Sequence, residues 1–127
     1  MVGTCGEHLT CFDLYHNGFP AHIIGGQHQY DIIMETNQEL LRIQVKTTNY
    51  TESGSYRYVI KRHKTDKVIG DYDCIDMFAF ACPKLRKVAY IPINEITQKY
   101  KVSIQPSMFD FYTIDRALSV HYDKGGV

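Results

Sequence analysis

The sequence contains no long run of apolar residues. None of its 127 residues belong to a stretch that approaches the roughly 18 consecutive apolar residues of a membrane-spanning helix. The first residues, Met1 to Glu7, lack both the basic region and the apolar core of a secretory signal. We therefore expect a cytoplasmic protein with no membrane partner.

Cysteine and histidine are present, but not in a recognisable metal motif. The four cysteines form no C-x-x-C pair, and the six histidines show neither HExxH nor HxxxH spacing. This argues against a zinc site built from these residues. Gly25-Gly26 is not followed by the Lys-Ser or Lys-Thr of a nucleotide-binding phosphate loop, so a turn is expected there.

An excess of charge of either sign is also absent. The 14 basic residues balance the 14 acidic ones, which argues against nucleic-acid binding by bulk electrostatics alone. The basic residues are nevertheless clustered. The first cluster, our candidate DNA-binding set, comprises Arg57, Lys61, Arg62, Lys64 and Lys67. A second comprises Lys84, Arg86 and Lys87. Taken alone, each cluster also fits a solvated loop or a charged hairpin turn.

Length and composition predict one folded domain over residues 1–127. A chain of this size with 44% hydrophobic residues can bury a core without disulfides. Mixed helical and strand patterns along the chain predict an α/β fold.

The most informative segment is the predicted strand Arg42–Thr48. Side chains two residues apart in a strand point to the same face. The strand therefore separates an apolar row, Leu41, Ile43 and Val45, from a polar row, Arg42, Gln44, Lys46 and Thr48. One row must be buried, and the polar row places an amide and an ammonium side by side.

A second predicted strand, Tyr30–Glu35, precedes this one. The residues between them, Thr36–Glu39, are typical of a turn, so the two strands are expected to pair as a hairpin. That pairing would bring the Asp31 carboxylate close to Gln44 and Lys46. A carboxylate, an amide and an ammonium together suit a hard cation and a phosphate.

Other segments complete the expected architecture. A first helix is predicted over Cys5–Asn17, because apolar residues recur at helical spacing before Gly18 and Pro20. The remaining expected elements are an extended piece at Ala21–Ile24, a strand at Tyr56–Lys61, central strands at Ile75–Cys82 and Lys87–Pro92, a short helix near Asn94–Lys101, and an amphipathic segment from Phe109 to Leu118.

The polar row can support phosphodiester hydrolysis. That reaction needs an oxygen-bound metal ion that polarises the phosphate and activates a water. Asp31 would be the principal ligand, Gln44 would offer a neutral carbonyl oxygen, and Lys46 would position the water or neutralise charge on the phosphate. Glu7, from the first helix, would add a second carboxylate. The residue types alone fit a plain solvated strand face at least as well.

The order of these residues resembles the PD-(D/E)XK nuclease superfamily. The resemblance rests on Gly6-Glu7-His8, Gly18-Phe19, Tyr30-Asp31 and Gln44-Val45-Lys46, covers roughly residues 3 to 96, and is nearest to the group that includes intron-encoded homing endonucleases. It implies a restriction-endonuclease-like fold, a mixed sheet flanked by helices. Tyr30 replaces the proline of the motif, and Gln44 stands at its (D/E) position.

The resemblance also implies an activity. It implies DNA cleavage dependent on Mg²⁺, with Mn²⁺ able to substitute. Glu7, Asp31, Gln44 and Lys46 are the implied catalytic residues, and Asp31, Gln44 and Glu7 the implied metal ligands. Homing, junction-resolving and restriction or repair nucleases all remain open, as do a non-catalytic DNA-binding module and a protein-interaction domain. Because cutting both strands needs two sites, a homodimer or homotetramer is expected. The segment from Met108 to Leu118 is either its interface or part of the monomer core.

Overall fold

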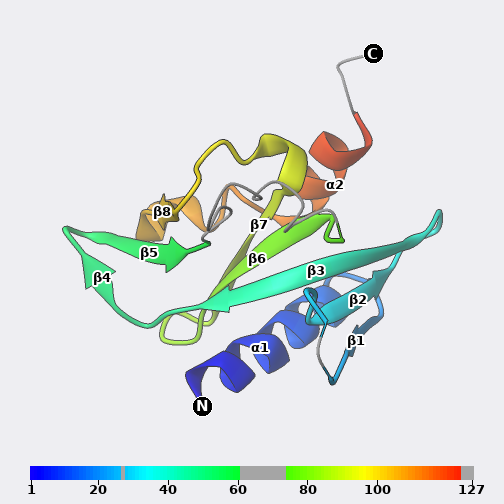
Figure 1. Cartoon of the computed structure of the whole chain (residues 1–127), viewed down its shortest axis with the longest axis horizontal. Coiled ribbons are helices and arrows are strands. Elements are labelled where there is room, and N and C mark those ends of the chain that lie inside the picture. The colour runs from blue at the N-terminus through cyan, green and yellow to red at the C-terminus, as the bar shows by residue number, and fades with distance from the viewer. Residues whose placement is uncertain (27, 61–73, 124–127) are drawn as a thin grey trace.

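The computed structural model describes residues 1–26, 28–60 and 74–123. The strands form two sheets, and the helices pack against the larger one (Figure 1). In chain order the elements are α1 (Val2–His16), β1 (Ala21–Ile23), β2 (Ile32–Glu35), β3 (Leu40–Thr47), β4 (Thr51–Glu52), β5 (Ser55–Val59), β6 (Met77–Cys82), β7 (Lys87–Pro92), the 3₁₀ turn η2 (Ile93–Glu95), β8 (Lys101–Ile104), the 3₁₀ turn η3 (Pro106–Met108) and α2 (Ile114–Tyr122).

The larger sheet is mixed and has the strand order β1-β2-β3-β6-β7. The expected hairpin is confirmed, because β2 and β3 pair antiparallel with Ile32 opposite Ile43. Next to them, β3 and β6 pair parallel, with Gln44 opposite Phe78 and Lys46 opposite Phe80. The expected mixed sheet flanked by helices is therefore present.

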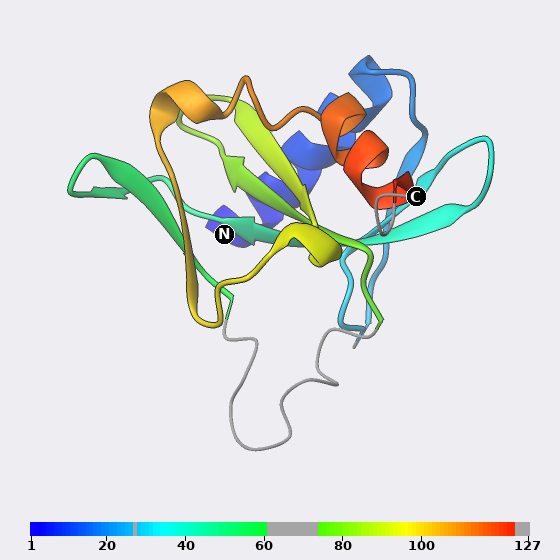
Figure 2. The ribbon, with the colours of Figure 1, turned by 90° about the horizontal axis from the view of Figure 1, so that it is seen from above.

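The two faces of this sheet are covered differently. Both α1 and α2 pack on one face, where Leu14, Ile114 and the apolar row of β3 form a buried core (Figure 2). The three-stranded sheet β4-β5-β8 contributes to a second core with Phe78 and Phe80. Since paired side chains share a face, Gln44 and Lys46 point to the side of this second core.

The second sheet was not expected from the sequence. The helix predicted near Asn94–Lys101 is wrong, because only η2 is helical there and the chain then extends into β8. β8 pairs antiparallel with β5, and this pairing buries Val102 and Ile104. The short strand β4 lies in a segment expected to be a loop. Tyr56 and Tyr58 are buried, so they pack the second core.

Two further expectations are corrected or refined by the structure. β7 is a terminal strand of the larger sheet rather than a central one, although the Tyr90 N–H donates to the Tyr112 carbonyl at 2.9 Å beyond it. In the segment from Met108 to Leu118, Phe109 and Ile114 are buried in the two cores, whereas Phe111 is exposed.

None of the helices in the described part of the chain has the length and apolar character needed to span a membrane.

Candidate active site

Asp31 lies at a notch in the larger sheet, where β2 begins and β3 continues past it. Its backbone N–H still donates to the Ile43 carbonyl at 2.8 Å. Its own carbonyl accepts from the Ile24 N–H at 2.9 Å, on the other side of the chain. Val45 lies beyond the last residue of β3 paired with β2, and its N–H donates to Asp31 Oδ2 at 2.8 Å. The carboxylate thus caps the edge of β3 and is fixed at the notch.

Gln44 and Lys46 flank this bond on β3. Both side chains are half-buried. Gln44 Oε1 is buried and, within the described part of the chain, has no hydrogen-bond partner. A buried carbonyl oxygen without a partner is costly, and a bound ligand would remove that cost.

The charges of Asp31 and Lys46 interact. Burial raises the pKa of the Asp31 carboxyl, while the Val45 N–H and the positive charge of Lys46 oppose that rise. The effect of burial on the pKa is the largest, because the notch removes the carboxylate from water. The charges of Asp31 and Lys46, which the sequence suggests as a metal ligand and a cation, therefore interact in the folded chain.

Glu7 lies on α1, which closely approaches β3 from the sheet face opposite to that of Gln44 and Lys46. Gly6 allows this approach, because a Cβ atom at position 6 would lie 1.9 Å from Thr47 Oγ1. The Thr10 hydroxyl donates to the Gly6 carbonyl at 2.8 Å on this buried side of the helix. Burial raises the pKa of Glu7 first, and the negative charge of Asp31 raises it further. The Glu7 and Asp31 carboxylates therefore lie close enough to repel each other.

These donors suit a hard cation. Mg²⁺ prefers oxygen ligands and is usually held by one or two carboxylates. Glu7 and Asp31 offer two carboxylates whose charges interact, and the Gln44 oxygen has no hydrogen-bond partner among the described residues. No group of three His, Cys, Asp or Glu residues suited to a metal occurs in residues 1–26, 28–60 and 74–123.

Nearby acidic residues are engaged elsewhere. Asp76 Oδ2 accepts from the Arg42 backbone N–H at 2.8 Å and from its Nε at 3.2 Å. Glu35 shares the strand face of Asp31, but its Oε2 lies 2.6 Å from His22 Nε2 in an exposed pair. Asp73 lies outside the described residues. Of these carboxylates, the described Glu35 and Asp76 are thus bound to other side chains.

The basic cluster expected to bind DNA is described only in part. Arg57 lies on β5, where its Nη1 contacts Glu52 Oε1 at 3.2 Å and its Nε is buried without a partner among the described residues. Lys61, Arg62, Lys64 and Lys67 lie outside the described residues. The role of this cluster stays a prediction.

A scan against family models decides the relationship of the chain. The model described as PD-(D/E)XK endonuclease matches residues 2–114. The chain belongs to the PD-(D/E)XK endonuclease family. This match confirms the resemblance seen in the sequence and extends it past β8.

Solved structures share the fold of this PD-(D/E)XK endonuclease. A bacterial homing endonuclease, I-Ssp6803I, superimposes with a TM-score of 0.72 at 15% identity over 95% of this chain and 90% of that one. The Holliday junction resolvase Hjc of the archaeal hyperthermophile Archaeoglobus fulgidus gives 0.59 at 17% identity, over 93% and 100%. No curated protein matches the sequence. At these identities the likeness establishes the restriction-endonuclease-like fold.

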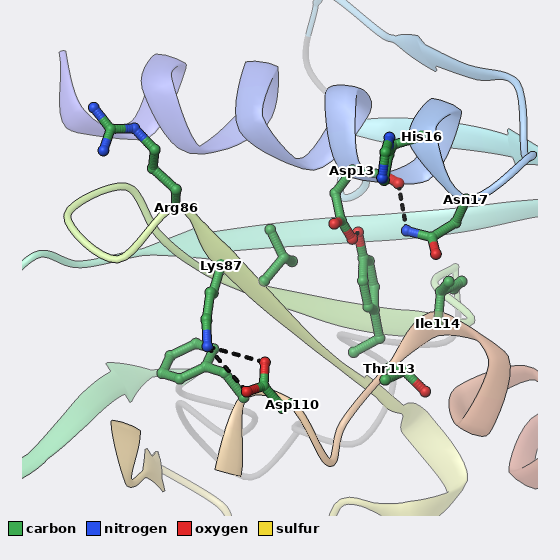
Figure 3. A pocket seen from close by; sticks show the side chains of 11 residues that line it. Asp13, His16, Asn17, Arg86, Lys87, Asp110, Thr113 and Ile114 are labelled. Atoms are coloured by element: carbon green, nitrogen blue, oxygen red, sulfur yellow. Dashed lines mark hydrogen bonds and ion pairs between the residues drawn. The ribbon is translucent and has the colours of Figure 1, made fainter. Parts of the chain in front are cut away.

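A separate cavity of about 280 Å³ lies between the end of α1, the start of β7 and the chain before α2 (Figure 3). None of the four candidate site residues lines it. Inside it, the Tyr90 hydroxyl donates to Asp13 Oδ2 at 2.7 Å. Sequence patterns gave no signal for this pair, because its members lie far apart in the chain.

The Asp13 carboxyl makes stability depend on pH. Burial raises its pKa more than the Tyr90 hydroxyl and His16 lower it. The folded chain therefore holds this proton more tightly than the unfolded chain, and the contribution of Asp13 to stability falls as pH rises from the ordinary Asp range through the raised pKa. We expect Asp13→Asn, which keeps an acceptor for Tyr90, to raise the Tm at pH 7 by roughly 1–3 °C.

The same substitution should have little effect near pH 3, where Asp13 is protonated in both states. Thermal melts of both proteins across this pH range test the expectation. Asp110→Asn is a control, since this exposed carboxylate lines the same cavity and pairs with Lys87. A Tm difference for Asp13→Asn that does not change with pH would contradict the assignment.

Proposed function

We propose that this chain is a Mg²⁺-dependent DNA endonuclease that hydrolyses phosphodiester bonds, with Mn²⁺ able to substitute. The observation that carries the proposal is the Asp31 carboxylate, which is held by the Val45 N–H between Gln44 and Lys46 and whose charge interacts with those of Lys46 and Glu7. Membership of the PD-(D/E)XK endonuclease family supports it. The fold alone would not, because one fold hosts many functions.

Each residue has a role in the proposed reaction. Asp31, Glu7 and Gln44 hold the cation, which supplies Lewis-acid polarisation of the phosphate and a more acidic water when bound. Lys46 donates hydrogen bonds to the attacking water or to the phosphate oxygens, where negative charge grows. The Val45 N–H keeps the Asp31 carboxylate at the notch, so the ligand is oriented before the cation arrives.

Wild-type cleavage of duplex DNA tests the proposal directly. Activity that requires Mg²⁺, is lost in EDTA and returns with Mn²⁺ is the expected result. Failure to cleave any duplex, junction or mismatched DNA in either metal would overturn it. The same substrate panel separates a homing or related site-specific enzyme from a junction-resolving or a restriction or repair enzyme.

We favour a homing-type or related site-specific nuclease within this class. The ordered Glu7, Asp31, Gln44 and Lys46 set resembles the group that contains homing endonucleases, and the neighbour with a TM-score of 0.72 is one of them. The neighbour with 0.59 resolves Holliday junctions, which keeps four-way junctions in the panel. Preference for a four-way junction over every linear duplex would replace the first choice with the second.

Gln44 is the residue that separates a nuclease from a non-catalytic DNA-binding module. An amide oxygen holds a cation more weakly than a carboxylate. We expect Gln44→Glu to tighten Mg²⁺ binding by roughly 10-fold, because it adds a charge at the buried oxygen. In metal-free buffer the same variant should melt below wild type, since three carboxylates then repel one another.

Gln44→Leu is the matched control, since it keeps the size of the side chain and removes the oxygen. It should weaken Mg²⁺ binding while raising the metal-free Tm, because no buried polar atom is left unpaired. Isothermal titration with Mg²⁺ and thermal melts in EDTA measure both effects. Equal Mg²⁺ affinity in wild type, Gln44→Glu and Gln44→Leu would favour the non-catalytic module.

DNA would be held by a basic cluster of the chain. Arg57 and its sequence neighbours Lys61, Arg62, Lys64 and Lys67 remain our proposal for contacts to the phosphate backbone. A homodimer or homotetramer is proposed because one chain offers one site and a duplex has two strands. Size-exclusion chromatography with light scattering reports the number of chains directly.

A further inference from the structure

We propose that the turn between β6 and β7, through Lys84 and Arg86, is a second element that contacts DNA phosphates. The inference rests on the proposed nuclease function and names a further part of its substrate-binding surface. The β6–β7 turn consists of residues 83 to 86.

The β6–β7 turn lies at the same end of the sheet as Lys46. β3 and β6 are parallel, so their final residues meet at one edge, where the Thr48 N–H donates to the Ala81 carbonyl at 3.2 Å. Asn49 follows on the chain leaving β3, and its Oδ1 accepts from the Lys84 N–H at 2.8 Å. In Figure 1 the turn lies beside the end of β3 and the first half of α1. A duplex that reaches Lys46 would pass this edge.

The turn is held rigidly. The Leu85 N–H donates to the Cys82 carbonyl at 3.1 Å, and the Arg86 N–H to the Pro83 carbonyl at 3.0 Å. The Leu85 side chain packs against the second core. The cationic side chains of Lys84 and Arg86 therefore extend from a fixed backbone, which lowers the entropy lost when they bind a ligand.

Charge at the turn is available for a ligand. Lys84 and Arg86 are exposed, and neither forms an ion pair with another described residue. The next residue differs, because Lys87 Nζ lies 3.0 Å from both carboxylate oxygens of Asp110 (Figure 3). In the same view the Arg86 side chain points away from that pair. Asp110 thus neutralises the charge of Lys87, whereas Lys84 and Arg86 have no ion-pair partner among the described residues.

Arg86 also occupies an unusual backbone conformation. Its φ of 55° lies in the left-handed region, which glycine and asparagine adopt most readily. The chain keeps an arginine where glycine would be less strained. Backbone strain of this kind gathers at functional sites, which supports a role for the Arg86 guanidinium. A planar guanidinium suits bidentate contact with a phosphate.

The test compares three single variants. Arg86→Gly removes the guanidinium and relieves the backbone, so its Tm should equal or exceed that of wild type. Lys84→Ala removes the other open cation. Lys87→Ala is the control, because it removes the same charge from a side chain already bound to Asp110. Fluorescence anisotropy with a labelled duplex in EDTA measures affinity over a range of salt concentrations.

Arg86→Gly and Lys84→Ala should each weaken duplex binding roughly 3- to 10-fold and lower the slope of log K against log salt by about 0.9, the value for one phosphate contact. Lys87→Ala should change neither quantity beyond error. In Mg²⁺, both test variants should need more protein for half-maximal cleavage and reach the wild-type maximal rate.

The outcomes separate this inference from the proposed function. Normal wild-type cleavage with an unchanged salt slope in Arg86→Gly and Lys84→Ala would overturn the turn as a phosphate contact and leave the nuclease standing. An equal loss in Lys87→Ala would also overturn it, because bulk charge would then explain the effect. Neither binding nor cleavage by wild type would contradict both.

Discussion

Asp31→Asn is expected to reduce Mg²⁺-dependent DNA cleavage by at least about 100- to 1,000-fold while leaving the fold intact. Asparagine has nearly the same shape and keeps an oxygen that can accept from the Val45 N–H. What disappears is the negative charge that would hold the cation. Single-turnover cleavage with protein in excess over DNA isolates this loss from any change in affinity.

Stability should move in the opposite direction. In metal-free buffer the Asp31 charge is disfavoured by burial, and it also disfavours the charge of Glu7. Asp31→Asn removes both penalties, so its Tm in EDTA should rise by roughly 2–5 °C. Wild type should gain Tm on addition of Mg²⁺, and the variant should not. A metal response retained by Asp31→Asn would exclude Asp31 as a ligand.

Asp76→Asn is the matched control for this substitution. Asp76 is another partly buried carboxylate. It lies directly before β6 and is bound to Arg42. Its loss should lower the Tm and leave the cleavage rate of the folded protein near that of wild type. Lys46→Ala extends the test to the cation of the site. Wild-type cleavage rates in both Asp31→Asn and Lys46→Ala would remove the proposed mechanism.

Gly6→Ala is expected to impair stability and cleavage together. The added Cβ would lie 1.9 Å from Thr47 Oγ1 and 2.8 Å from both Cβ and Cγ2 of the same residue, so α1 must move away from β3. Overpacking of this kind costs about 1–3 kcal/mol. Because Glu7 is the next residue, its carboxylate moves with the helix. A displacement near 1 Å can lower a rate about 100-fold.

Gly3→Ala is the control within the same helix. A Cβ at position 3 meets no atom within 4 Å, so the substitution should raise stability by roughly 0.5–1 kcal/mol through better helix formation. Thr47→Ala removes two of the three crowding atoms and should restore part of the loss in a Gly6→Ala double variant. Thermal melts and single-turnover rates measure both. Equal behaviour of Gly3→Ala and Gly6→Ala would refute the close contact.

The hairpin, and with it the closeness of three of the four candidate residues, could be predicted from the sequence. Alternating polarity in β3 and the turn residues before it fix both strand type and register, and register alone places Asp31 near Gln44 and Lys46. Glu7 was identified through family resemblance, because no local pattern shows which helix residue meets a remote strand. The need for glycine at position 6 depends on that same tertiary contact.

The second sheet could not be predicted for a different reason. Lys101–Ile104 is short, and its partner β5 lies more than forty residues earlier, at Ser55–Val59. Local spacing around Asn94–Lys101 suggested a helix, and tertiary pairing overrode it. The bond from Val45 to Asp31 was equally invisible, since a backbone N–H carries no sequence signal.

The parallel pairing of β3 with β6 has a consequence for the order of folding. The β2–β3 hairpin joins near neighbours in the chain, such as Met34 and Leu41, whereas β3 meets β6 through Ile43 and Met77. Loop closure must precede the second pairing, which makes it the slower event. Asp31, Gln44 and Lys46 all belong to this hairpin region, so we expect these three residues to come together before β3 pairs with β6.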